Sequence, residues 1–227
     1  VASGIDLGVI LDLFCTSFGS ILESFWEPSE SQFATILRAG KNSRTADMVA
    51  AMLDQGTTNM SKFEISEKLE SAGARLSFFN GQARVGFSGK FLSEDTKMVM
   101  DLLADQLQNP LFAEEELEKS KKRQVAAYKR SKDSTRGNAM NNMLEAFYGS
   151  DHQNSPTDPD KAIEQIKKLT PQDLKKYHQE NYGLGSMVLV VVGDVDHAKL
   201  ENLIKENYSN WKQSPLKNNC LLYTSDA

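Results

Sequence analysis

Residues 47–57 read Asp47-Met48-Val49-Ala50-Ala51-Met52-Leu53-Asp54-Gln55-Gly56-Thr57. The apolar residues of this stretch and the Gly-Thr pair at its end predict a helix from about Thr45 to Gln55. A second helix is predicted directly afterwards, because Ser61 and Glu64 have the S-x-x-E spacing of a capping box. The region therefore consists of two short helices joined by a glycine-containing turn.

Strands are predicted on both sides of this helix pair. Residues 32–39 predict a strand that leads into the first helix. After the second helix, residues 75–80 and 83–88 alternate polar and apolar side chains around Asn80-Gly81, which is a favoured pair for a tight hairpin turn. Alternation places the apolar side chains of both strands on one face, so we expect helices to cover that face.

Helices dominate the rest of the chain. Residues 93–107, 114–133 and 140–147 predict three of them, and Thr170-Pro171 begins another, since proline suits the first helical position. The continuous apolar run 186–192 predicts a strand in the centre of the sheet. We therefore expect an α+β fold, a two-layer domain whose mainly antiparallel sheet is covered on one face by helices.

The order and spacing of these segments resemble the insulinase/pitrilysin family of zinc metallopeptidases, the inverzincins, which includes the mitochondrial processing peptidases. The shared features are the apolar turn before Gly56-Thr57 and the Gly73-Ala74 step into a strand. Residues 169–182 and 187–196 also resemble a later signature of that family. The matching segments run from about residue 32 to residue 211, and the resemblance implies the α+β domain of these peptidases.

The resemblance also implies that the zinc chemistry has been lost. Inverzincins carry H-x-x-E-H, in which two histidines bind zinc and the glutamate is the general base. Counting back from Gly56-Thr57 places Asp47 and Ala51 at the histidine positions and Ala50 at the glutamate. The third ligand of the family is a later glutamate, and Tyr128 falls at that position. We therefore expect no catalytic residue and no zinc in this chain.

In this family, active enzymes are built from two homologous halves, fused or separate, and commonly only one half carries zinc. The resemblance thus implies a catalytically inactive domain that forms part of the proteolytic chamber and supports binding of the peptide substrate. Its expected partner is a half with an intact H-x-x-E-H motif, which would hold the zinc. An alternative is a structural or assembly subunit of the same fold with no role in proteolysis.

A peptidase with a different mechanism is disfavoured by the residues themselves. Neither Cys15 nor Cys220 lies in a matched segment, and no serine lies in a G-x-S-x-G elbow. The three histidines are His152, His178 and His197, and none lies four residues from another. We expect surface or helix-end positions for them, with His178 on a solvated helix face.

Composition disfavours two classes of partner. The net charge is −5 and the longest basic run has three residues, so a nucleic acid is not expected, since phosphate binding needs a concentrated positive face. The apolar-rich residues 8–26 are interrupted by Asp12 and Glu23, which argues against a membrane span. The compartment stays open between the cytoplasm and the periplasm of a bacterium.

The expected organisation is one metallopeptidase-like domain at residues 31–211. Residues 1–30 are an unassigned N-terminal segment, with apolar side chains at the spacing of an amphipathic helix. Residues 212–227 would begin a linker. The last eight residues resemble the translated read-through of a sequencing adapter, in which case the native chain would continue past Asn219.

Overall fold

The computed structural model describes residues 30–37, 44–80, 85–149, 155–184 and 187–213. In chain order the elements are β1 (Glu30–Leu37), α2 (Arg44–Ala50), α3 (Lys62–Ser71), β2 (Arg75–Asn80), β3 (Val85–Leu92), η1 (Ser93–Asp95), α4 (Thr96–Gln108), α5 (Glu114–Lys132), α6 (Thr135–Tyr148), α7 (Pro159–Lys168), α8 (Pro171–Asn181), β4 (Met187–Val192) and α9 (His197–Tyr208). The two expected terminal segments, at residues 1–30 and 212–227, lie almost wholly outside the described residues.

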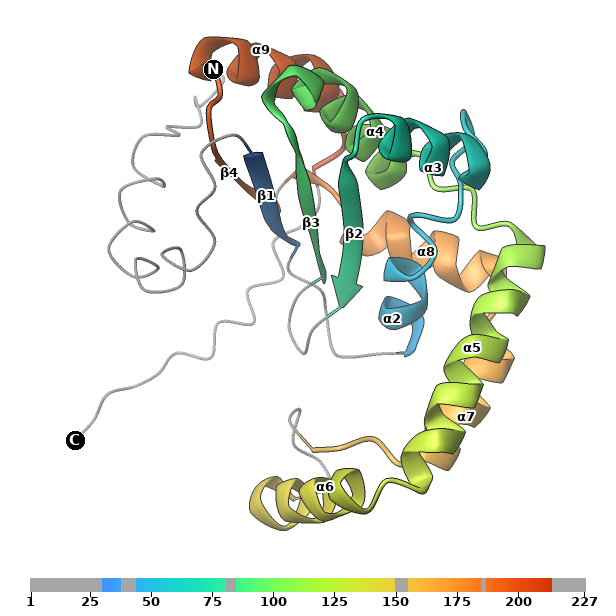
Figure 1. Ribbon diagram of the computed structural model, residues 1–227. Helices are drawn as coiled ribbons and strands as arrows, with labels where there is room; N and C mark the ends of the chain where they lie inside the picture. Colours follow the sequence, from blue (N-terminus) through green and yellow to red (C-terminus); the bar gives the residue numbers. More distant parts are fainter. Residues whose placement is uncertain (1–29, 38–43, 81–84, 150–154, 185–186, 214–227) are drawn as a thin grey trace.

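The sheet has four described strands in the order β2-β3-β1-β4, and each neighbouring pair is antiparallel. The predicted antiparallel pairing is confirmed, with Phe78 opposite Phe87 and their rings 6.2 Å apart in an edge-to-face contact. Asn80 pairs with Val85 as the last residue of β2, so the strands are not joined by a tight turn at Asn80-Gly81, and the connecting residues 81–84 lie outside the described residues. The helices gather on one side of the sheet, with α3, α4 and α9 near one end of the strands and α2 and α8 near the other (Figure 1). The predicted α+β fold is therefore confirmed.

The prediction of a central position for residues 186–192 is wrong for the sheet formed by the described residues. There β4 pairs with β1 and lies at the edge. Every residue of β4 is partly buried, so neither face of the strand is fully solvated. An unbroken apolar run reports on the coverage of both faces of a strand, and it carries no information about the number of neighbouring strands.

The capping residues predicted for two helices, Ser61 and Thr170, are confirmed, whereas the helix predicted from residue 140 already begins at Thr135. At α3, the Ser61 amide donates to the Glu64 carboxylate at 2.7 Å, and the Glu64 amide donates to the Ser61 hydroxyl at 3.3 Å. Thr170 and Asp173 form a second capping box at α8, with Pro171 in its first turn. The helix predicted for 45–55 is shorter than expected, because a series of turns replaces it after Ala50.

The core lies between the sheet and the helices next to it. It includes Met48 and Leu53 from the α2 region, Phe87 from β3 and Leu103 from α4, all with no exposed surface. In contrast, α6 has no buried residue and lies apart from the sheet, at the far end of α5 (Figure 1). Among the described helices, none is both long and apolar enough to span a membrane.

Candidate functional site

The predicted motif positions Asp47, Ala50 and Ala51 lie on and just after α2. This helix buries Ala46, Met48, Val49 and Ala50. The side that carries Arg44 and Asp47 is only partly buried. Arg44 and Asp47 are one helical turn apart, so their side chains lie on the same face. Arg44 Nη1 lies 2.9 Å from Asp47 Oδ2, and the two side chains are only 13% and 27% exposed.

Tyr128 faces this pair from α5. Its hydroxyl accepts a hydrogen bond from the same Nη1 atom of Arg44, and the Arg44 guanidinium carbon lies 5.8 Å from the centre of the Tyr128 ring. The structure therefore brings together two of the predicted motif positions, Asp47 and Tyr128, with an arginine between them. The sequence prediction missed Arg44, although an arginine three residues before an acid on a helix face was a usable signal.

Asn80 completes the surroundings of the Asp47 carboxylate. Its side-chain amide, at the end of β2, donates to Asp47 Oδ1, while Arg44 holds Oδ2. Both carboxylate oxygens are thus occupied by donors from the protein itself. We call Arg44, Asp47, Asn80 and Tyr128 the Arg44 cluster.

Tyr177 from α8 borders the Arg44 cluster. Burial raises the pKa of the Tyr177 hydroxyl to about 12, and the nearby Asp47 carboxylate adds to the rise. A phenol with this pKa stays protonated at neutral pH, so it contributes no negative charge to the site. Ala50 is 3% exposed and Ala51 is partly buried, and neither side chain can accept a proton.

The Arg44 cluster does not fit a zinc ion. Catalytic zinc sites use three protein ligands and keep a fourth position open. Here a single carboxylate already uses both oxygens, and the guanidinium beside it is a permanent cation with no lone pair to offer. Within the described part of the chain, no group of three or more His, Cys, Asp or Glu could hold a metal ion. That the chain carries no zinc remains a prediction, which a metal analysis must test.

His178 lies in the core, so the prediction of a solvated position for it is wrong. Its side of α8 carries Leu174, His178 and Asn181 at the i, i+4, i+7 spacing of a buried helix face. The ring is 6% exposed and stacks on Tyr182, with ring centres 4.7 Å apart. His197 is exposed at the start of α9, and His152 lies outside the described residues.

A hydrogen bond holds the buried His178 ring against α4. The His178 Nε2 atom lies 2.7 Å from the Leu107 carbonyl oxygen, which can only accept, so Nε2 carries the proton. Burial lowers the pKa of His178 to about 4. The ring is therefore neutral at pH 7 and serves packing, with no route to a substrate.

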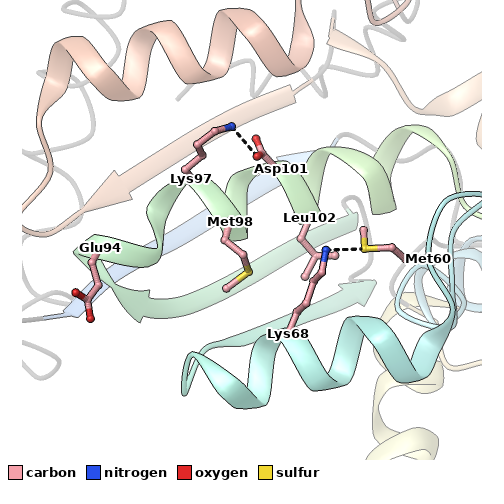
Figure 2. Close-up of a pocket in the computed structure, with 7 residues that line it drawn as sticks. All are labelled: Met60, Lys68, Glu94, Lys97, Met98, Asp101 and Leu102. Atoms are coloured by element: carbon pink, nitrogen blue, oxygen red, sulfur yellow. Dashed lines mark hydrogen bonds and ion pairs between the residues drawn. The ribbon is translucent and has the colours of Figure 1, made fainter.

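A shallow groove of about 390 Å³ lies between α3 and α4 (Figure 2). Its lining residues are Met60, Lys68, Glu94, Lys97, Met98, Asp101 and Leu102. The Lys97 ammonium is paired with Asp101 at 2.8 Å, and Lys68 Nζ lies 3.3 Å from the Met60 sulfur. The hydrogen bond to Asp101 raises the pKa of Lys97, so this ammonium stays protonated and is not a nucleophile.

Comparison with protein families and known structures agrees with the fold. Residues 40–160 match the family model described as insulinase (peptidase family M16), and residues 168–226 match the model of the peptidase M16 inactive domain. The crystal structure of a peptidase M16 inactive domain from Pseudomonas fluorescens superposes with a TM-score of 0.71 at 21% identity, covering 81% of this chain and 46% of that chain.

Two relatives illustrate the range of proteins that this sequence resembles. An uncharacterized zinc protease of Rickettsia felis is 27% identical over 169 residues, which cover 74% of this chain and 40% of that protein. The mitochondrial cytochrome b-c1 complex subunit 1 of Bos taurus is 27% identical over 170 residues, covering 74% of this chain and 35% of that protein. The chain therefore spans less than half the length of these relatives.

Proposed function

Because the chain belongs to the insulinase family, peptidase family M16, we propose that it is a catalytically inactive domain of a two-half zinc metallopeptidase. One observation carries the proposal: Arg44 fills the space between Asp47 and Tyr128, the positions at which the family resemblance would place two of the three zinc ligands. A half without these ligands cannot lower the pKa of a bound water, which is the central catalytic step of such enzymes.

The partner of this domain would be a half with an intact H-x-x-E-H motif, fused to it or encoded separately. That half would hold the zinc and cleave the peptide. The present domain would close one side of the proteolytic chamber and help to hold the peptide substrate there. The similarity to a zinc protease of Rickettsia felis and to an M16 inactive domain supports this assignment.

A structural or assembly subunit is the second candidate. The 27% identity to the bovine cytochrome b-c1 complex subunit 1 favours it, since that protein is named as a component of a respiratory complex. The two candidates differ in their neighbours. A peptidase would have an H-x-x-E-H half in the same or an adjacent gene, whereas a scaffold would not need one.

The test is a peptide-cleavage assay on the full-length protein with and without the H-x-x-E-H half. The domain alone is expected to cleave no peptide, and the mixture or fusion is expected to cleave more than the catalytic half alone. Full activity of the catalytic half without this domain would support the structural alternative. Cleavage by this domain alone, abolished by a chelator, would contradict both candidates.

A further inference from the structure

We propose that Arg44 is an internal cation that takes over the position of the metal ion, so that it both holds the degenerate site together and keeps metal ions out of it. The proposal rests on the assignment of Asp47 and Tyr128 to former ligand positions. It assigns a specific role to a residue outside the H-x-x-E-H spacing. In the Arg44 cluster, contacts within the protein would take the place of contacts to a metal ion.

The contacts of Arg44 join parts of the chain that are far apart in sequence. The residue lies on α2, Tyr128 lies 84 positions later on α5, and Asp47 in turn binds Asn80 at the end of β2. A zinc ion does the same in a metal site, where one positive centre draws ligands from separate elements. A planar guanidinium can replace it in this respect, because its donors are fixed in direction and suited to carboxylate and hydroxyl oxygens.

The charge balance of the site depends on Arg44. Asp47 is mostly buried, its second oxygen is held by a neutral amide, and the Tyr177 hydroxyl beside it stays protonated. Loss of the guanidinium would leave a carboxylate in a poorly solvated position without a cation. Such a group is costly, so the structure would be expected to respond by opening around α2.

The same position explains why a metal ion would be excluded. A zinc ion bound to Asp47 would lie about 2 Å from a carboxylate oxygen, in the space next to the guanidinium. Two positive centres so close together repel each other strongly where water is scarce. Restoring the missing ligands should therefore not be enough to restore zinc binding while Arg44 remains.

The first test compares two rebuilt variants of the full chain. Both carry the substitutions Asp47→His, Ala50→Glu, Ala51→His and Tyr128→Glu, and one of them also carries Arg44→Met. Zinc affinity is measured by competition with a chromophoric chelator, using zinc ions alone as the probe. With Arg44 in place, the guanidinium can pair with the new carboxylate at position 128. We expect the variant with Arg44→Met to bind zinc at least about tenfold more tightly, and equal affinities would overturn the proposal.

The second test needs no rebuilt ligand set, so it tests the role of Arg44 even if the rebuilt variants do not fold. A double-mutant cycle with Arg44→Met and Asp47→Asn is measured by urea unfolding. The control cycle uses Lys205→Met and Glu201→Gln, an exposed pair on α9 with an N–O distance of 2.6 Å. We expect the Arg44–Asp47 coupling to change the unfolding constant by about fivefold or more, and the control by about twofold.

The outcomes separate this inference from the proposed function. Coupling in the Arg44–Asp47 cycle no larger than in the control would contradict the role of Arg44 as an internal cation. The proposed function, an inactive domain, would be unaffected by that result. Zinc bound by the unaltered chain would contradict the proposed function and also the exclusion of metal ions by Arg44, whatever the size of the coupling. Strong coupling together with metal exclusion by Arg44 would support both.

Discussion

The imidazole of His178 donates from Nε2 to the Leu107 carbonyl oxygen across 2.7 Å, inside the contact between α8 and α4. The ring is also covered by Tyr182, whose ring stacks on it, and by the edge of Phe112. These surroundings favour the neutral imidazole over the charged form, because burial of the ring removes the water that would solvate the positive charge.

Stability should therefore fall in mild acid. Burial lowers the pKa of His178 from 6.5 to about 4 in the folded protein, so below pH 6.5 the unfolded chain binds a proton that the folded chain does not. The contribution is complete above pH 6.5, declines as the pH falls, and is lost at about pH 4. We expect the loss of this contribution to lower the free energy of unfolding by about 1 kcal/mol between pH 7 and pH 5.5.

Urea unfolding at these two pH values measures the effect. In the His178→Gln variant, the amide can still donate to the Leu107 carbonyl, and this part of the pH dependence should disappear. The matched control is His197→Gln, because His197 is exposed and this variant keeps the buried His178 and its effect on stability. An unchanged pH dependence in His178→Gln would show that His178 does not titrate in this way.

The turn that follows α2 requires glycine. Gly56 has φ of 121°, which lies beyond the left-handed region that asparagine tolerates, and its carbonyl accepts from the Leu111 amide at 3.1 Å. Gly56→Ala should destabilise the protein by about 1–3 kcal/mol in thermal or urea unfolding. The control is Gly73→Asn, where φ is 60° and an added Cβ meets nothing within 4 Å. Equal losses in the two variants would contradict the structure at Gly56.

The burial of β3 against the helices can be tested with a pair of phenylalanines. Phe87 has no exposed surface, whereas Phe147 on α6 is 79% exposed. Phe87→Ala should lower the free energy of unfolding by about 3–5 kcal/mol, because it leaves a cavity in the core. Phe147→Ala should change it by less than about 0.5 kcal/mol. A large loss in Phe147→Ala would mean that α6 packs against a further surface.

Local features of the chain were predictable and long-range ones were not. The capping residues Ser61 and Thr170 act within one helical turn, and strands β2 and β3 are marked by alternation of polar and apolar neighbours, so their signals are contained in short windows. The sheet position of β4 depends on which distant strands pair, and a single apolar run carries no information about that.

In the candidate site, too, local features were predictable from the sequence and tertiary contacts were not. Comparison with the spacing of a known motif singled out Asp47 and Tyr128, but the contact between α2 and α5 that joins them through Arg44 is a tertiary one. The burial of His178 was readable from the spacing of Leu174, His178 and Asn181, but the prediction considered only whether a second histidine lay near it in sequence. Polar residues on a mostly polar helix are difficult to place because a few apolar neighbours decide the buried face.

Zinc content of the purified full chain is the most direct test of an inactive domain. The protein is saturated with zinc, dialysed against metal-free buffer and measured by inductively coupled plasma mass spectrometry, with an H-x-x-E-H half treated in parallel. We predict no stoichiometric zinc in this chain and one zinc ion per catalytic half. One tightly held zinc ion per molecule of this chain would contradict it.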